Sequence, residues 1–125
     1  IVFIWSKRQK PKYKKIDYSV IESPKVRALR RMKNLQNNGL AKDFYTKLSH
    51  ITREFLETKY FIKALEMTTK QIEKSRAIFP LSDSLFINLV EVLNDADQVK
   101  YAKSIPKAEK FDDDKKRITN LINQL

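Results

Sequence analysis

The chain is poor in the residues that make disulfides, tight turns and metal sites. Its 125 residues include no cysteine, one histidine, one glycine and four prolines. Without cysteine there is no disulfide framework and no thiolate chemistry, and zinc lacks its commonest ligands. One glycine cannot build a glycine-rich phosphate loop, and sheet proteins usually need more glycine in their turns. A chain of this length, rich in lysine, leucine and isoleucine, therefore indicates one mainly helical domain.

Acidic residues are scarce in the first third of the chain. Residues 1–39 carry eleven Lys/Arg against two acids, whereas residues 40–125 carry fifteen against thirteen. The first five residues, Ile1–Trp5, are an apolar run that ends in tryptophan, and a cluster of bases follows at once. This order is typical of a transmembrane helix at the point where it leaves the bilayer on the cytoplasmic side.

We expect residues 1–22 to be the end of a transmembrane segment plus a basic juxtamembrane linker, and residues 23–125 to be a cytoplasmic helical domain. Basic clusters at this position bind anionic lipid. The residues predicted to contact lipid are Lys7, Arg8, Lys10, Lys12, Lys14 and Lys15. Five apolar residues are far fewer than the roughly 20 that a span needs. The alternatives are a soluble protein whose first residues form a strand or pack on the core, and the mature end of a processed chain.

The first helix of the domain is predicted to begin at Ser23-Pro24, a capping residue followed by a proline at the first helical position. Asn37-Asn38-Gly39 is expected to end it, because glycine and asparagine tolerate the left-handed conformation there. Its narrow apolar stripe contains Val26, Leu29 and Met32, with Leu35 as a further candidate. The opposite face is basic and carries Arg27, Arg30, Arg31 and Lys33.

The strongest helical pattern covers residues 41–60. Its apolar side chains lie three or four residues apart, at Phe44, Leu48, Ile51, Phe55 and Leu56. A helix over 69–78 follows, because Thr68 and Gln71 match a capping box and Phe79-Pro80 breaks the pattern. We expect it to turn Ile72, Ala77 and Ile78 inward.

Two more helices are predicted, over 83–95 and from Pro106 to Leu125. The inner face of the former contains Leu85, Phe86, Leu89, Val90 and Leu93, and Asn94–Asp97 is expected to stop it. The last helix places Phe111, Ile118, Leu121, Ile122 and Leu125 on one side. Residues 98–103 fit either a helical turn or a short strand. The predicted fold is thus all-α, a compact domain of about five helices, which becomes winged-helix-like if 98–103 is a minor strand.

Catalytic and metal-binding patterns are weak. His50 is the only histidine, and its neighbour Ser49 cannot face it on a helix, because adjacent residues point about 100° apart. We therefore expect a partly exposed, structural His50 and no enzymatic activity, cofactor or metal. The acidic runs Asn94–Asp97 and Asp112–Asp114 lack the ligand spacing and central glycine of a calcium loop. Asp112–Asp114 is expected to be a solvated patch near the start of the last helix.

Three segments resemble an uncharacterised bacterial family of single-span membrane proteins, whose genes lie beside those for a MoxR-type AAA+ ATPase and the von Willebrand-factor-A aerotolerance (Bat) proteins. They read Tyr45-x-x-Leu48-x-x-Ile51-x-x-x-Phe55-Leu56-Glu57, Ala64-Leu65-Glu66-Met67-Thr68-Thr69-x-x-Ile72 and Leu89-x-x-x-Leu93-x-x-Ala96-Asp97-x-Val99-Lys100-Tyr101-Ala102-Lys103. Many members carry arginine where this chain has Glu54. The resemblance implies a location in the bacterial inner membrane, with this domain cytoplasmic, and it implies those neighbours as partners; it implies no established activity.

Two functions fit these features. The first is a non-enzymatic protein-interaction domain, an adaptor or accessory in a MoxR/Bat-type envelope or stress-tolerance system. The alternative is a winged-helix-like nucleic-acid-binding domain, which the net charge of +11 favours. Its reading helix would be 83–95, which has no Lys or Arg to meet a polyanion. We expect Tyr45, Tyr60 and Tyr101 to complete the core, although tyrosines also serve as interface anchors.

Overall fold

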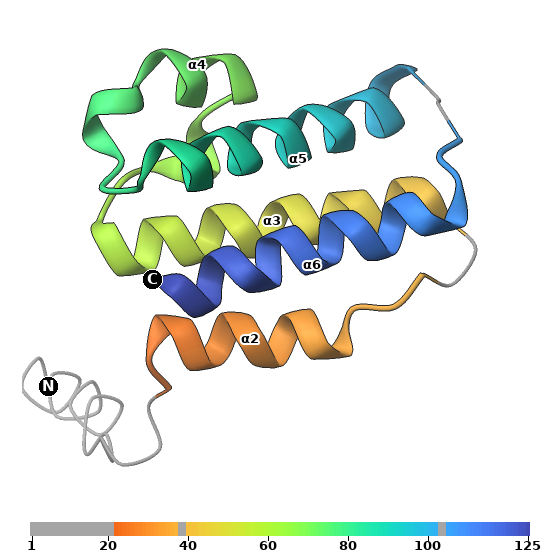
Figure 1. Ribbon diagram of the computed structural model, residues 1–125, viewed down its shortest axis with the longest axis horizontal. Coiled ribbons are helices and arrows are strands. Elements are labelled where there is room, and N and C mark those ends of the chain that lie inside the picture. Colours follow the sequence, from red (N-terminus) through yellow and green to blue (C-terminus); the bar gives the residue numbers. More distant parts are fainter. Residues whose placement is uncertain (1–21, 38–39, 103–104) are drawn as a thin grey trace, which may run out of the picture.

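The computed structural model describes residues 22–37, 40–102 and 105–125 (Figure 1). These residues form an all-α domain, as predicted, and contain no strand. The helices are α2 (Pro24–Asn34), α3 (Ala41–Tyr60), α4 (Thr69–Lys74), α5 (Asp83–Ala102) and α6 (Ala108–Gln124), with short 3-10 turns η3 (Ala64–Glu66) and η4 (Arg76–Ile78). No helix in this part of the chain combines the length and apolarity that crossing a membrane requires.

The central element is α3, which packs against α2, α5 and α6. Its wide apolar stripe is buried, and this confirms the prediction from three- and four-residue spacing. Figure 1 shows α2, α3 and α6 lying side by side, with α5 and the short α4 on the other side of α3. The fully buried side chains include Tyr45, Leu48, Leu56, Ile72, Leu89, Leu93, Ile118, Leu121 and Ile122.

Two helix starts follow their predicted capping residues. The Ser23 side chain accepts a hydrogen bond from the Val26 N–H at 3.2 Å, with Pro24 as the first helical residue. Thr68 Oγ1 accepts from the Gln71 N–H at 3.1 Å, and Gln71 Oε1 accepts from the Thr68 N–H at 2.9 Å. Such reciprocal bonds satisfy amide donors that a helix start leaves without partners.

The predicted stop of α5 at Asn94–Asp97 is wrong. The helix continues to Ala102, so residues 98–102 are helical and a strand there is excluded; 103 lies outside the described residues. Ala96 and Val99 are buried, and Asp95 Oδ2 lies 3.0 Å from Lys110 Nζ of α6. Burial and this ion pair outweigh the modest helix propensity of Asn and Asp.

Further expectations about burial or helix length need correction: α2 ends at Asn34, before the residues 37–39 that were expected to end it. Val26, Ala77 and Ile78 are exposed, and Tyr101 is 77% exposed instead of completing the core. The helix predicted over 69–78 ends at Lys74 and continues as η4. Arg76 then donates to the carbonyl oxygens of Phe79 and Leu81, at 3.0 and 2.7 Å. These bonds hold the turn into α5, which leaves Ile78 facing outward.

Phe61 ends α3 in an unusual backbone conformation. Its φ of 58° is left-handed, the conformation that usually selects glycine at this position. Its N–H donates to the Glu57 carbonyl at 2.9 Å, while its side chain is 90% exposed. A β-carbon in this region clashes with the backbone, at a cost of roughly 1–2 kcal/mol.

Phe61→Gly is therefore expected to raise the free energy of unfolding by about 1 kcal/mol, because it removes the strained β-carbon and only an exposed ring. Urea denaturation of the two proteins measures the change. Phe61→Ala is the matched control, since it removes the ring but keeps the β-carbon, and it should bring no gain. A less stable Phe61→Gly protein would contradict this account and would show that the ring packs.

Candidate functional site

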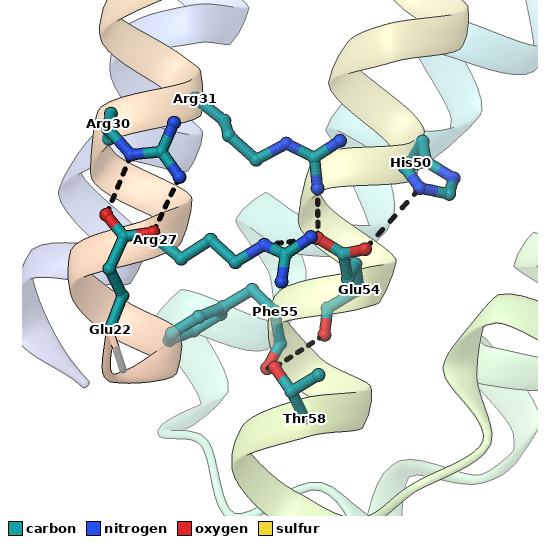
Figure 2. A network of polar contacts seen from close by, with 8 residues as sticks. All are labelled: Glu22, Arg27, Arg30, Arg31, His50, Glu54, Phe55 and Thr58. Carbon is teal, nitrogen blue, oxygen red and sulfur yellow. Dashed lines mark hydrogen bonds and ion pairs between the residues drawn. The ribbon is translucent and has the colours of Figure 1, made fainter. Parts of the chain in front are cut away.

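Two arginines of α2, Arg27 and Arg31, reach Glu54 of the neighbouring helix α3 (Figure 2). Arg31 of α2 is hydrogen-bonded to Glu54, and Arg27 Nε lies 3.6 Å from the same carboxylate. His50, one turn earlier on α3, places Nε2 3.7 Å from the other oxygen of Glu54. One partly exposed carboxylate thus faces two guanidinium groups and an imidazole, so the site keeps an excess of positive charge.

Glu22 neutralises a different arginine of α2. Its two oxygens accept from Arg30 at 2.6 and 2.7 Å in a bidentate pair (Figure 2). Hydrogen bonding to Arg30 holds the pKa of Glu22 below its usual range. Because the pair is exposed, it adds little stability. Its main effect is to neutralise Arg30, which leaves Arg27 and Arg31 as the arginines of α2 that face Glu54.

A cleft of about 420 Å³ opens between α2 and α3 beside these charges. It is lined by Arg31, Asn34, Leu35, Thr46, Lys47, His50 and Ile51. Leu35 and Ile51 are buried and give it an apolar floor, while Arg31, Lys47 and His50 supply basic groups. Within the described residues, no acidic side chain lines it; Asp43 Oδ2 lies 3.1 Å from the Lys47 amine on the exposed side of α3. We call this feature the α2–α3 cleft.

A larger cleft, of about 840 Å³, follows the first turns of α6. Its charged lining residues are Lys107, Lys110 and Lys116 with Glu109, Asp112 and Asp113. Three bases and three acids cancel, so this cleft has no preference for a ligand of either charge. The smaller α2–α3 cleft is the better candidate site because its lining contains basic side chains and, within the described residues, no acidic one.

A second polar cluster is buried between α3, α5 and α6. The Tyr45 hydroxyl donates to Asp114 Oδ2 at 2.6 Å, and Asp114 is fully buried. Lys110 Nζ lies 3.0 Å from Asp95 Oδ2 and 3.8 Å from Asp114 Oδ1. Burial raises the pKa of Asp114 to about 6, against the opposing effects of the Tyr45 hydrogen bond and Lys110. Burial, with Asp114 beside it, also raises the pKa of Tyr45. The cluster fixes α6 to α3 and α5.

The structure corrects the sequence analysis at Asp114 and supports it at His50. Asp112–Asp114 was expected to be solvated, but Asp114 is buried because it falls between Phe111 and Ile118 on the apolar face of α6. His50 is half-exposed and pairs with Glu54, as a structural histidine would. Ser49 is buried and accepts a hydrogen bond from Arg53.

The predicted lipid-contacting residues Lys7, Arg8, Lys10, Lys12, Lys14 and Lys15 lie outside the described residues.

Two pairings of charged side chains were not predicted from the sequence. His50 and Glu54 are four residues apart on one helix, a spacing that brings side chains together. This pair could therefore have been predicted from the sequence. The arrival of Arg27 and Arg31 on Glu54 depends on how α2 packs against α3, and no local pattern reports that.

Comparison with models of known protein families finds no match, and comparisons with curated proteins and with solved structures find no significant match. The resemblance to the single-span membrane-protein family therefore rests on its motif residues alone.

Proposed function

We propose that residues 23–125 form a non-enzymatic protein-interaction domain, and that the α2–α3 cleft receives an acidic, partly apolar segment of a protein partner. The observation that carries the proposal is the cleft lining, in which Arg31, Lys47 and His50 adjoin an apolar floor. A partner carboxylate would gain charge-assisted hydrogen bonds from the cations. An apolar neighbour of that carboxylate would cover Leu35 and Ile51, as the core of an interface does.

The proposed setting is the cytoplasmic face of a bacterial inner membrane. It is supported by the apolar run Ile1–Trp5 followed at once by bases, which is the order expected at the exit of a span. In this proposal the basic residues between 7 and 15 contact anionic lipid, and the helical domain meets its partner beyond them. The family resemblance makes a MoxR-type ATPase or a von Willebrand-factor-A protein the first partner to test, with this chain as adaptor or accessory.

Nucleic-acid binding is the rival function, and α5 argues against it. The helix that would enter a groove carries one base, Lys100, against Asp83, Glu91, Asp95 and Asp97. Phosphate contacts from Lys and Arg supply most of the affinity for nucleic acid. The helical conformation of residues 98–102 also removes the wing strand from the described part of the domain.

Lys47→Glu is expected to weaken binding of the partner about tenfold, which corresponds to about 1.4 kcal/mol, because it places a like charge beside the incoming carboxylate. Lys47 is exposed, so the change should leave the fold intact. The dissociation constant is measured by titrating the purified chain with a MoxR-type ATPase and, separately, with a von Willebrand-factor-A protein. Binding should also weaken with salt, since the contact is electrostatic.

Lys70→Glu on α4 is the matched control, because it makes the same charge change at an exposed site outside the cleft. If both variants weaken partner binding equally, the effect comes from net charge, and the α2–α3 cleft is not the binding site. Photo-crosslinking from position 46, within the cleft, should capture the same partner. Displacement of that partner from this chain by duplex DNA would favour the nucleic-acid function instead.

A further inference from the structure

One end of the bundle presents an exposed aromatic side chain on a strained backbone. Phe61 is 90% exposed and left-handed, and Leu65, four residues later, is also exposed. A large apolar group in water and a left-handed non-glycine residue are each unfavourable, and here they coincide. Neither feature contributes to the core or to the α2–α3 cleft.

Contacts along the helices define which end this is. Lys25 Nζ donates to the Asn123 carbonyl at 2.9 Å, so the start of α2 meets the end of α6. Arg27 is level with Glu54, and α2 and α3 run in opposite directions (Figure 1). At 1.5 Å of rise per residue, Phe61 then lies about one helical turn beyond the start of α2. We call this region, with Val26, Phe61 and Leu65 exposed, the Phe61 end.

Two lysines lie within two residues of the exposed ring in the chain, and two acids, Glu57 and Glu66, lie four and five residues from it. Lys59 and Lys63 flank Phe61 in the chain, and the Lys59 amine lies 5.6 Å from the centre of the Tyr60 ring. Glu57 is engaged locally, because one of its oxygens accepts from the Leu65 N–H at 3.2 Å. Glu66 is the one acid in residues 61–67. Lysines around a projecting phenyl ring match the interface of an anionic bilayer, which attracts cations and accepts aromatic side chains.

We propose that the Phe61 end rests on an anionic membrane surface, with the Phe61 ring inserted at the level of the lipid headgroups. A projecting ring needs no complementary pocket in a fluid layer, and Phe61 lines none of the clefts described above. The chain also enters the domain at this end, through Glu22 and Ser23. The inference adds a second, folded contact to the proposed lipid contact of the basic segment, and it does not depend on the α2–α3 cleft.

The test places the only tryptophan of the chain at position 61. Trp5→Phe removes the single natural tryptophan, and Phe61→Trp is added to it in the full chain. The matched control is Ile105→Trp in the same background. Ile105 is 91% exposed and lies at the opposite end, just before α6. Each protein is mixed with vesicles of phosphatidylcholine and phosphatidylglycerol, or of phosphatidylcholine alone, and co-sedimentation is measured beside fluorescence.

The Phe61→Trp protein should show a blue-shifted emission with the anionic vesicles and a loss of intensity when the acyl chains are brominated. The Ile105→Trp protein should show neither, and Lys63→Glu should reduce the shift at position 61. Co-sedimentation without a shift at 61 would overturn the inference while leaving lipid binding by the basic segment in place. Equal shifts at 61 and 105, or no binding to anionic vesicles, would also overturn it.

Discussion

Phe55→Ala is expected to lower the free energy of unfolding by about 3–5 kcal/mol, the range for removing a buried phenyl ring. Phe55 is 2% exposed and belongs to α3, the helix that contacts α2, α5 and α6 together. Partial collapse around the lost ring is restricted, because those helices are also held by other side chains of α3. Leu48→Ala and Leu89→Ala, at fully buried positions, should each cost about 2–5 kcal/mol.

Urea denaturation followed by circular dichroism measures these losses. Lys42→Ala is the matched control, because it truncates an exposed side chain on α3 and should stay within about 0.5 kcal/mol of the parent. Unchanged stability in all three core variants would mean that the packing of α3 has been misassigned. A loss in Lys42→Ala as large as in Phe55→Ala would show that the losses do not report core packing, because alanine has a higher helix propensity than lysine.

Local signals in the sequence were sufficient wherever a helix is specified by its own residues. The caps at Ser23-Pro24 and Thr68–Gln71 could be predicted because a cap involves residues within one turn of each other. The apolar stripe of α3 was readable for a similar reason, since its period is that of the helix itself. The fold class followed from these elements and from the near absence of glycine.

Predictions failed where contacts between distant segments override local preference. Asp95 looked like part of a helix stop, yet the ion pair with Lys110 and the burial of Val99 continue α5 past it. Tyr101 looked like a core residue by type, but the last turn of α5 leaves it in solvent. Both outcomes depend on where α6 lies, which is not encoded within residues 94–101.

The candidate site could be predicted only in part. The basic face of α2 was visible from the spacing of Arg27 and Arg31, and His50 was correctly expected to be partly exposed. The cleft itself needs the antiparallel packing of α2 on α3, which brings Leu35 beside Ile51. That packing follows from burying two apolar stripes at once, so it becomes apparent only when the helices are assembled.

Because of Asp114, the free energy of unfolding of the domain should fall as the pH rises between about 4 and 6. Its pKa is raised to about 6 in the folded state, chiefly by burial, whereas an unfolded aspartate titrates near 3.9. Between these values the folded protein binds a proton that the unfolded chain has lost, so raising the pH favours unfolding. A shift of about two units corresponds to about 3 kcal/mol, fully present as a penalty above pH 6. Tyr45, Asp95 and Lys110 are the titratable groups that face Asp114.

Asp114→Asn should remove this slope and stabilise the domain at pH 7 by up to about 3 kcal/mol, because the amide oxygen still accepts from Tyr45 and no buried charge remains. Denaturation is measured from pH 4 to 7 for the variant and the parent, and the difference cancels all groups that titrate alike in both. Asp113→Asn is the matched control at an exposed neighbour, and it should keep the slope of the parent. An Asp114→Asn protein that is less stable at pH 7, or equally dependent on pH, would show that Lys110 and Tyr45 fully compensate the buried carboxylate. The cluster would then be a net source of stability, and burial would no longer explain the raised pKa of Asp114.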